Sequence, residues 1–205
     1  MDIIEILGVA GSLSLLAGWR LYLTILATGT AMHFGWLPLP EHLAALKVLA
    51  EPWVLGAAAV GTIAEFFADK VAWVDSVWDA IHSFVRPMGG ALLALALVDA
   101  SDPIWQVIAF LLGGGGALLS HGAKATTRAV VNVSPEPFSN VAVSAGEDVA
   151  TGGLLTLAIA FPALAIGIAI VLALAAVAVI WVLGRLLRNI KRALTPDQRS
   201  SSETG

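Results

Sequence analysis

Apolar segments separated by short polar breaks dominate the chain, and most are close to the length that a bilayer requires. They cover residues 6–34, 52–68, 104–120, 141–160 and 162–183. A helix needs roughly 20 apolar residues to cross the hydrocarbon core. A sixth segment, residues 88–98, is so short that it would span only with its flanking turns. The pattern therefore predicts an all-α, polytopic membrane helix bundle of about six apolar segments.

The composition favours lipid over water as the solvent of this chain. Of its 205 residues 58% are hydrophobic and 13% are charged, against about 25% charged in soluble domains. The chain has no cysteine, which excludes disulfides, thiolate metal sites and a cysteine nucleophile. We expect one transmembrane domain over residues 1–194 and a disordered cytoplasmic tail over residues 195–205.

The distribution of lysine and arginine predicts the orientation. With six spans, Lys47 falls outside, Arg20 lies within a span, and nine basic residues share the other side: Lys70, Arg86, Lys124, Arg128, Arg185, Arg188, Lys191, Arg192 and Arg199. Basic residues are enriched in cytoplasmic loops. We therefore expect a multi-pass protein of the inner (plasma) membrane with both termini in the cytoplasm.

Residues 65–86 are the stretch around which the other charges can be placed. Within it we expect residues 73–85 to form an amphipathic helix that lies in the inner interface without spanning, and Pro87 to stop that helix. Asp75, Asp79, His82 and Arg86 follow one another at i, i+4, i+7 and i+11, and so share one side of that helix. Two aspartates and a histidine could hold a hard divalent metal ion. The same row could instead be the wet face of an interfacial helix at the inner mouth.

Charged residues inside the apolar segments are the candidate substrate or ion site. A charge at the bilayer centre costs about 2.5 to 3.5 kcal/mol on insertion scales, so it should pair or face water. The residues are a site for an ion, a proton or an anionic substrate near the midplane, or they are structural salt bridges. They are Arg20, Glu65, Lys124, Glu147 and Asp148.

Weak similarity between the two halves suggests an inverted repeat over residues 1–100 and 101–194. The matching positions are Gly18 with Gly122, Arg20 with Lys124, and Glu65 with Glu147. Inverted repeats are common among secondary transporters, which place their sites between the halves. We therefore expect ion pairs that cross between halves, joining Arg20 to Glu147 or Asp148 and Lys124 to Glu65 or Asp69.

Two further features each allow two interpretations. Residues 113–116 are four consecutive glycines, which could break the helix near a ligand or allow close helix packing. His121 and Arg128, on either side of Lys124, could bind an anion or a lipid headgroup at the inner mouth. They could equally be ordinary cytoplasmic basic residues.

Four segments carry a resemblance to a known family: GWRLYLTILATG, EFFADKVAWVDSVWDAIHSFVRPMGGALLA, SHGAKATTRAVVN and SNVAVSAGEDV. They resemble the signature segments of the small bacterial membrane proteins grouped as domain of unknown function 4126. The resemblance covers roughly residues 12–155 and implies a bacterial multi-span protein. It implies no reaction and no substrate.

The residues leave three functions open. The first is a transporter or channel-like protein for a small solute or ion. The second is a membrane enzyme that acts on a lipid headgroup through its aspartate and histidine cluster, and the third is a non-catalytic lipid-binding or scaffold protein. No motif indicates a cofactor, a nucleotide or nucleic acid. The expected partners are membrane lipid, a small solute or ion, and further copies of the chain.

Overall fold

The computed structural model describes residues 3–36, 47–97, 103–132 and 138–194, and these residues form helices without any strand. The all-α prediction is confirmed, whereas the expected disordered tail lies outside the described residues. Prolines begin three of the helices, where their missing N–H costs nothing. The helices are α1 (Ile3–Trp19), α2 (Leu21–His33), α3 (Pro52–Ala68), α4 (Ala72–Leu97), α5 (Pro103–Val131), α6 (Phe138–Ala160) and α7 (Pro162–Leu194).

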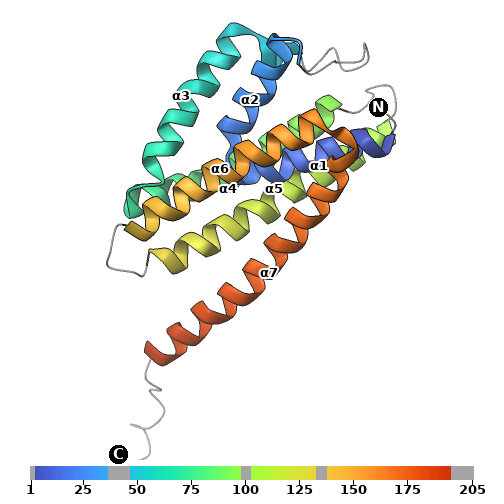
Figure 1. The fold of residues 1–205 in the computed structure, drawn as a ribbon. Coiled ribbons are helices and arrows are strands. Elements are labelled where there is room, and N and C mark those ends of the chain that lie inside the picture. The colour runs from blue at the N-terminus through green and yellow to red at the C-terminus, as the bar shows by residue number, and fades with distance from the viewer. Residues whose placement is uncertain (1–2, 37–46, 98–102, 133–137, 195–205) are drawn as a thin grey trace, which may run out of the picture.

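Helix α1 lies at the centre of the bundle, packed against α4, α5 and α7, while α2 and α3 form a pair to one side (Figure 1). Three buried serine hydroxyls of α1 and α5 tie the helices together by donating to backbone carbonyls. Ser12 donates to Ala165, Ser14 to Gly90, and Ser120 to Leu15. Side-chain hydrogen bonds of this kind are a usual link between helices in membranes.

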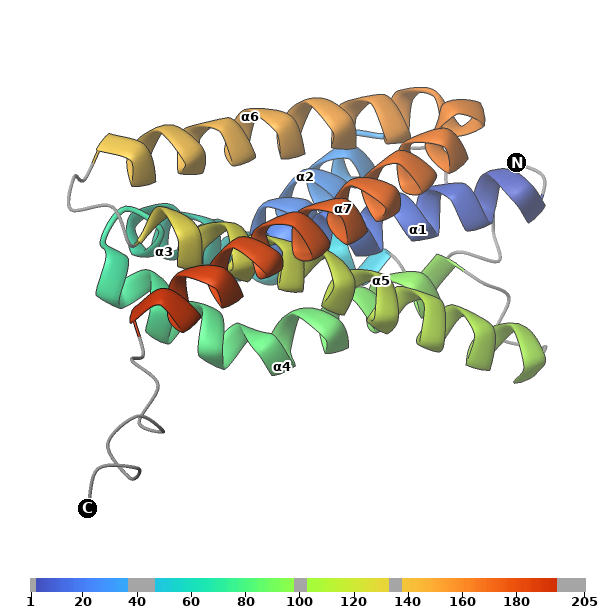
Figure 2. The same cartoon turned by 90° about the horizontal axis from the view of Figure 1, so that it is seen from below.

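The two described ends of the chain lie at opposite ends of the bundle. Helix α1 begins where α7 begins, with Gly8 packed against Ile166, and α7 ends at the far end (Figures 1 and 2). The prediction that both termini face the cytoplasm is not confirmed, and residues 1–2 and 195–205 lie outside the described residues.

The first apolar segment forms two helices instead of one. The break is at Arg20, whose φ of −140° and ψ of 79° are not helical. The Trp19 carbonyl faces the Lys124 Nζ at 3.4 Å, and the Arg20 carbonyl accepts bonds from the backbone and hydroxyl of Thr24. Buried protein groups therefore satisfy the backbone at the break, as irregular structure at membrane depth requires.

The predicted interfacial helix is wrong, because α4 runs unbroken through Pro87 for 26 residues. Its polar row is buried instead of wet: Asp75 and Arg86 are 0% exposed. The opposite row is exposed, with Trp73 at 73% and Phe84 at 78%. Helix α4 is thus amphipathic in the reverse sense, with charges facing protein and aromatic rings facing outward.

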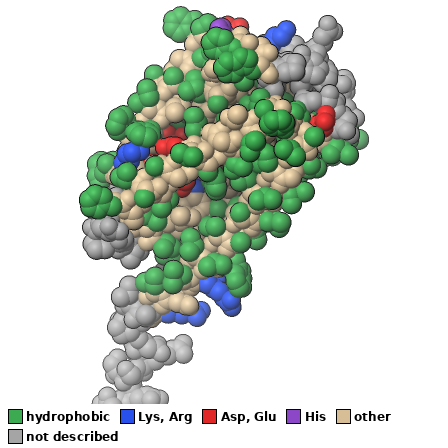
Figure 3. Space-filling model, viewed as in Figure 1, with side chains coloured by type: hydrophobic (Ala, Val, Ile, Leu, Met, Phe, Trp, Pro, Cys, Tyr) green, Lys and Arg blue, Asp and Glu red, His purple; other side chains and the backbone are tan. Residues whose placement is uncertain are grey.

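Among the residues that the structure describes, three helical stretches are long and apolar enough to cross a membrane: Trp73–Leu97, Pro103–Val131 and Pro162–Ile190. Ile4–Trp19 and Pro52–Ala68 are apolar but shorter. The count of six spans is therefore not confirmed, and neither is the inverted repeat. Hydrophobic side chains cover much of the visible surface (Figure 3), as expected for a chain in contact with lipid.

The four glycines of α5 allow close packing and do not break the helix. A Cβ atom added at Gly113 would lie 2.5 Å from the Ala94 Cβ and 2.6 Å from the Gly90 carbonyl oxygen. One added at Gly115 would meet nothing within 4 Å. Helices α4 and α5 therefore cross at Gly90 and Gly113, where only hydrogen atoms separate their backbones.

We expect Gly113→Ala to lower the free energy of unfolding in detergent by about 1–3 kcal/mol, because backbone atoms that cannot move aside would clash with the methyl group. Gly115→Ala is the matched control on the same helix, and it should be neutral or slightly stabilising. Titration with a denaturing detergent measures both changes. Equal effects of the two variants would contradict this account of the crossing.

Candidate functional site

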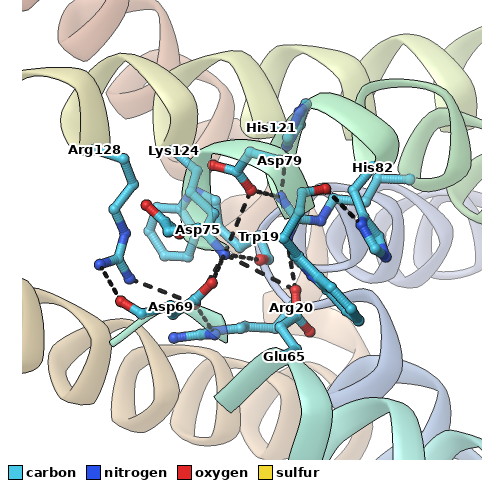
Figure 4. Close-up of polar contacts among 12 residues, drawn as sticks. Trp19, Arg20, Glu65, Asp69, Asp75, Asp79, His82, His121, Lys124 and Arg128 are labelled. Carbon is cyan, nitrogen blue, oxygen red and sulfur yellow. Dashed lines mark hydrogen bonds and ion pairs between the residues drawn. The ribbon is translucent and has the colours of Figure 1, made fainter. Parts of the chain in front are cut away.

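Ten charged side chains meet inside one half of the bundle, and Figure 4 shows the part of this cluster around Asp69 and Lys124. They come from the α1–α2 break, the end of α3, the turn before α4, and the facing halves of α4, α5 and α6. We call this set the buried charge network. Its members are Arg20, Glu65, Asp69, Asp75, Asp79, Arg86, Lys124, Arg128, Glu147 and Asp148.

Asp69, in the turn between α3 and α4, is the centre of the network. Its carboxylate accepts a hydrogen bond from Arg20, lies 3.0 Å from the Lys124 Nζ and 3.4 Å from the Arg128 Nη2. Burial alone would raise the pKa of the Asp69 carboxyl, but the charges of Lys124, Arg20 and Arg128 together hold that pKa below its ordinary value. Asp69 is therefore held as a carboxylate that joins three helices.

Arg20 reaches from the helix break to α6. Its guanidinium lies 3.4 Å from Glu147 and 3.1 Å from Asp148, and it donates to the Ser144 carbonyl and hydroxyl. Lys124 lies 3.9 Å from Glu65. The expected crossed pairs are thus present in the structure. The bond from Arg20 to Asp69 is an addition to them, and no ion pair joins Arg20 to Glu65 among the described residues.

Arg86 forms the second centre, on α4. It donates to Glu65 at 2.6 Å, to Asp79 at 2.9 Å and to the His121 Nδ1 at 2.6 Å. A guanidinium can only donate, so His121 Nδ1 must be the acceptor and the ring proton must sit on Nε2. That Nε2–H faces the Ser83 hydroxyl at 3.0 Å. His121 is therefore neutral and oriented wrongly to accept a proton from Ser83.

His82 forms its hydrogen bonds with Trp78 and Tyr22, and not with the aspartates of its own helix. Its Nδ1 donates to the Trp78 carbonyl at 2.7 Å, and Tyr22 donates to its Nε2 at 3.1 Å. Asp79 instead pairs with Arg86. No group of three or more metal-ligating side chains occurs within the described parts of the chain, so the structure does not support a metal site at this row.

Arg128 and His121 are both buried within the bundle. The guanidinium of Arg128 lies 2.9 Å from Glu147 and donates to the Asn140 side chain at 3.2 Å. Arg128 thereby links the end of α5 to the first half of α6. Protein groups thus already bind both terminal nitrogens of Arg128, while its buried Nε has no partner among the described residues.

A cavity of about 260 Å³ borders the network between α4 and α5, where Asp75, Asp79 and Arg128 are its charged lining residues. Two apolar cavities flank α2. One, of about 450 Å³, lies against α6 beside Ala27, and the other, of about 340 Å³, lies against α4 beside Ile25. The charged cavity opens beside the network, whereas α2 is incompletely packed on two sides.

The sequence profile of the family described as Domain of unknown function (DUF4126) matches residues 7–182. The chain belongs to this family. The match includes every member of the network and confirms the resemblance noted from the four segments. No curated protein and no solved structure matches the chain.

Several side chains of this DUF4126 protein hold the network together but carried no clear signal in the sequence. Asp69 is followed directly by Lys70, and such a pair of opposite charges is typical of an exposed turn. The sequence predicts Asp69 only as an alternative partner of Lys124. Asn132 and Asn140 flank a loop and looked like loop formers. In the structure Asn140 donates to Asn132 at 2.8 Å and accepts from Arg128. Only the spatial closeness of α5 and α6 reveals these roles.

Proposed function

We propose that this protein is an integral membrane transporter for a small solute or ion, with the buried charge network as its binding region. The observation that carries the proposal is the helix break at Arg20, which places a fully buried guanidinium among carboxylates from the α3–α4 turn and from α6. Discontinuous helices at the binding site are a recurring feature of secondary transporters.

The half of the bundle that does not contain the buried charge network argues against an open channel. Apolar side chains such as Leu13, Leu97 and Leu155 fill it, so no continuous polar path crosses the described residues. Movement of a solute would then require alternating access. Helix α2 is the element best suited to move, because it starts at the break and has cavities on two sides.

The basic residues support an orientation for this proposal. The turn between α3 and α4 and the end of α5 lie toward the end of the bundle where α7 ends (Figure 1), and these three segments contain Lys70, Arg128, Arg185 and Arg188. By the positive-inside rule that end faces the cytoplasm. The network then opens toward the cytoplasm of a bacterial inner membrane, and α1 starts near the opposite face.

A second candidate function is a non-catalytic membrane scaffold. It is favoured by the dense pairing of the network, in which Glu65, Asp69 and Asp79 each lie within 4.0 Å of two or more basic nitrogens. A scaffold of this kind would bind lipid or further copies of the chain and move nothing. The lipid-enzyme alternative gains no such support, because His121 and His82 are both held by other groups.

Flux across proteoliposomes tests transport against scaffolding. We expect the purified full chain to give substrate-gradient currents on a solid-supported membrane for at least one small ion or solute, with proton gradients tested in both directions. Ala27→Phe should slow that flux severalfold, because it fills the cavity against which α2 would move. Gly115→Ala, which meets open space, is the control and should keep the wild-type rate. Folded protein with no current under any gradient would leave the scaffold as the function.

A further inference from the structure

Asp75 stands apart from the other acidic members of the network. Glu65, Asp69, Asp79, Glu147 and Asp148 each lie within 4.0 Å of a lysine or arginine nitrogen. Asp75 is 0% exposed and makes no ion pair with the described residues. The ten network residues comprise six acids and four bases, so their formal charge is −2 when all are ionised.

The hydrogen bonding of Asp75 is also incomplete. Its Oδ2 faces the Asn132 Nδ2 at 3.5 Å, and its Oδ1 has no hydrogen-bond partner. Asn140 occupies the Asn132 oxygen at 2.8 Å, which turns the Asn132 amide nitrogen toward Asp75. Asp75 is also one of the residues that line the charged cavity of about 260 Å³, and its unpartnered Oδ1 is buried.

The charges that face Asp75 come from every element around it and offset one another. Asp79 lies one turn along α4, Asp69 lies in the preceding turn, and Lys124 and Arg128 face it from α5. Two negative and two positive neighbours leave burial as the deciding influence, and burial favours the neutral form of a carboxyl. Neutralising Asp75 therefore removes an unpaired buried charge, which is otherwise costly.

We propose that Asp75 binds and releases a proton through the cavity between α4 and α5, and that this proton is the coupling ion of the transport proposed above. A proton needs only the one free oxygen, Oδ1. A metal ion would need several oxygen ligands, but Asp79, the other carboxylate at the cavity, is paired with Arg86, and Asn132 turns its amide nitrogen toward Asp75.

The step is a plain proton transfer. Water in the cavity delivers a proton, an O–H bond forms at Asp75 Oδ1, and one O–H bond of the hydronium donor breaks. The carboxylic acid that results is neutral, and release reverses the same two bond changes. Nothing is oxidised or reduced.

Infrared spectroscopy of the purified full chain tests this site directly. We expect a carboxylic-acid C=O stretching band that appears on acidification of the folded protein and disappears on alkalinisation. Asp75→Asn, which has the shape of the neutral acid and should fold, should lack that band. Ser76→Ala, also at the cavity, should keep it. Replacing Na⁺ by choline should leave the titration unchanged.

Three results would overturn the proposal: a band that persists in Asp75→Asn, no titrating band at all, or a titration that Na⁺ shifts. The last result would assign the site to a metal cation. The proposal depends on the transport function, but the two fail separately. A titrating Asp75 without any flux would refute transport and keep the proton site. Flux that Asp75→Asn leaves unchanged would keep transport and refute the coupling role.

Discussion

Replacing Asp69 with asparagine should destabilise the protein by about 3–5 kcal/mol, the usual cost of removing one partner from a buried charge cluster. The carboxylate joins Arg20, Lys124 and Arg128, and its loss would leave three buried cations with fewer counter-charges. Asparagine keeps the shape of the side chain, so the loss would reflect charge and hydrogen bonding. The free energy of unfolding, measured by detergent titration at neutral pH, gives the size of the effect.

Glu51→Gln is the matched control for Asp69→Asn, because Glu51 is an exposed acid at the start of α3. Its effect should stay within about 0.5 kcal/mol. The stabilisation from Asp69 should also depend on pH, since its pKa is lowered in the folded state. This stabilisation is complete above the pKa of Asp69 in the unfolded chain, about 3.9, and it is lost as the pH falls through the lower pKa of Asp69 in the folded protein. If Asp69→Asn lowers the free energy of unfolding no more than Glu51→Gln does, that result would contradict the central position of Asp69 in the network.

The sequence was enough to predict that the embedded charges pair, because an isolated charge in lipid is too costly to leave alone. It also placed Asp75, Asp79, His82 and Arg86 on one side of a helix, which the structure shows. It could not tell whether that side met water or protein. A row of charges next to aromatic residues looks the same in both cases, and the answer depends on α5, which approaches through the glycines at its crossing.

The position of the helix ends was beyond the sequence for a related reason. Pro87 usually stops a helix in water, yet α4 continues through it, as neighbouring helices in a membrane allow. Arg20, by contrast, follows no proline and still ends α1. The break exists because Asp69, Glu147 and Asp148 surround its guanidinium and Lys124 approaches the Trp19 carbonyl. These partners come from distant parts of the chain, so no local pattern records them.

Replacing Arg20 with methionine should cost about 3–5 kcal/mol, because it leaves Asp148 without its basic partner and removes one from Asp69 and Glu147. A double-mutant cycle then separates direct pairs from distant ones. Arg20→Met combined with Glu147→Gln should show a coupling energy of about 0.5–3 kcal/mol, as residues in contact do. The cycle is measured from unfolding free energies in the same detergent.

Arg20→Met combined with Glu65→Gln is the comparison, since Glu65 pairs with Arg86 and Lys124 and not with Arg20. We expect these two losses to add to within about 0.5 kcal/mol. Strong coupling to Glu65 with additivity at Glu147 would reverse the pairing seen here. Additivity in both cycles would mean that Arg20 stabilises the fold without these acids. Its other acidic partners, Asp69 and Asp148, would then account for that stabilisation.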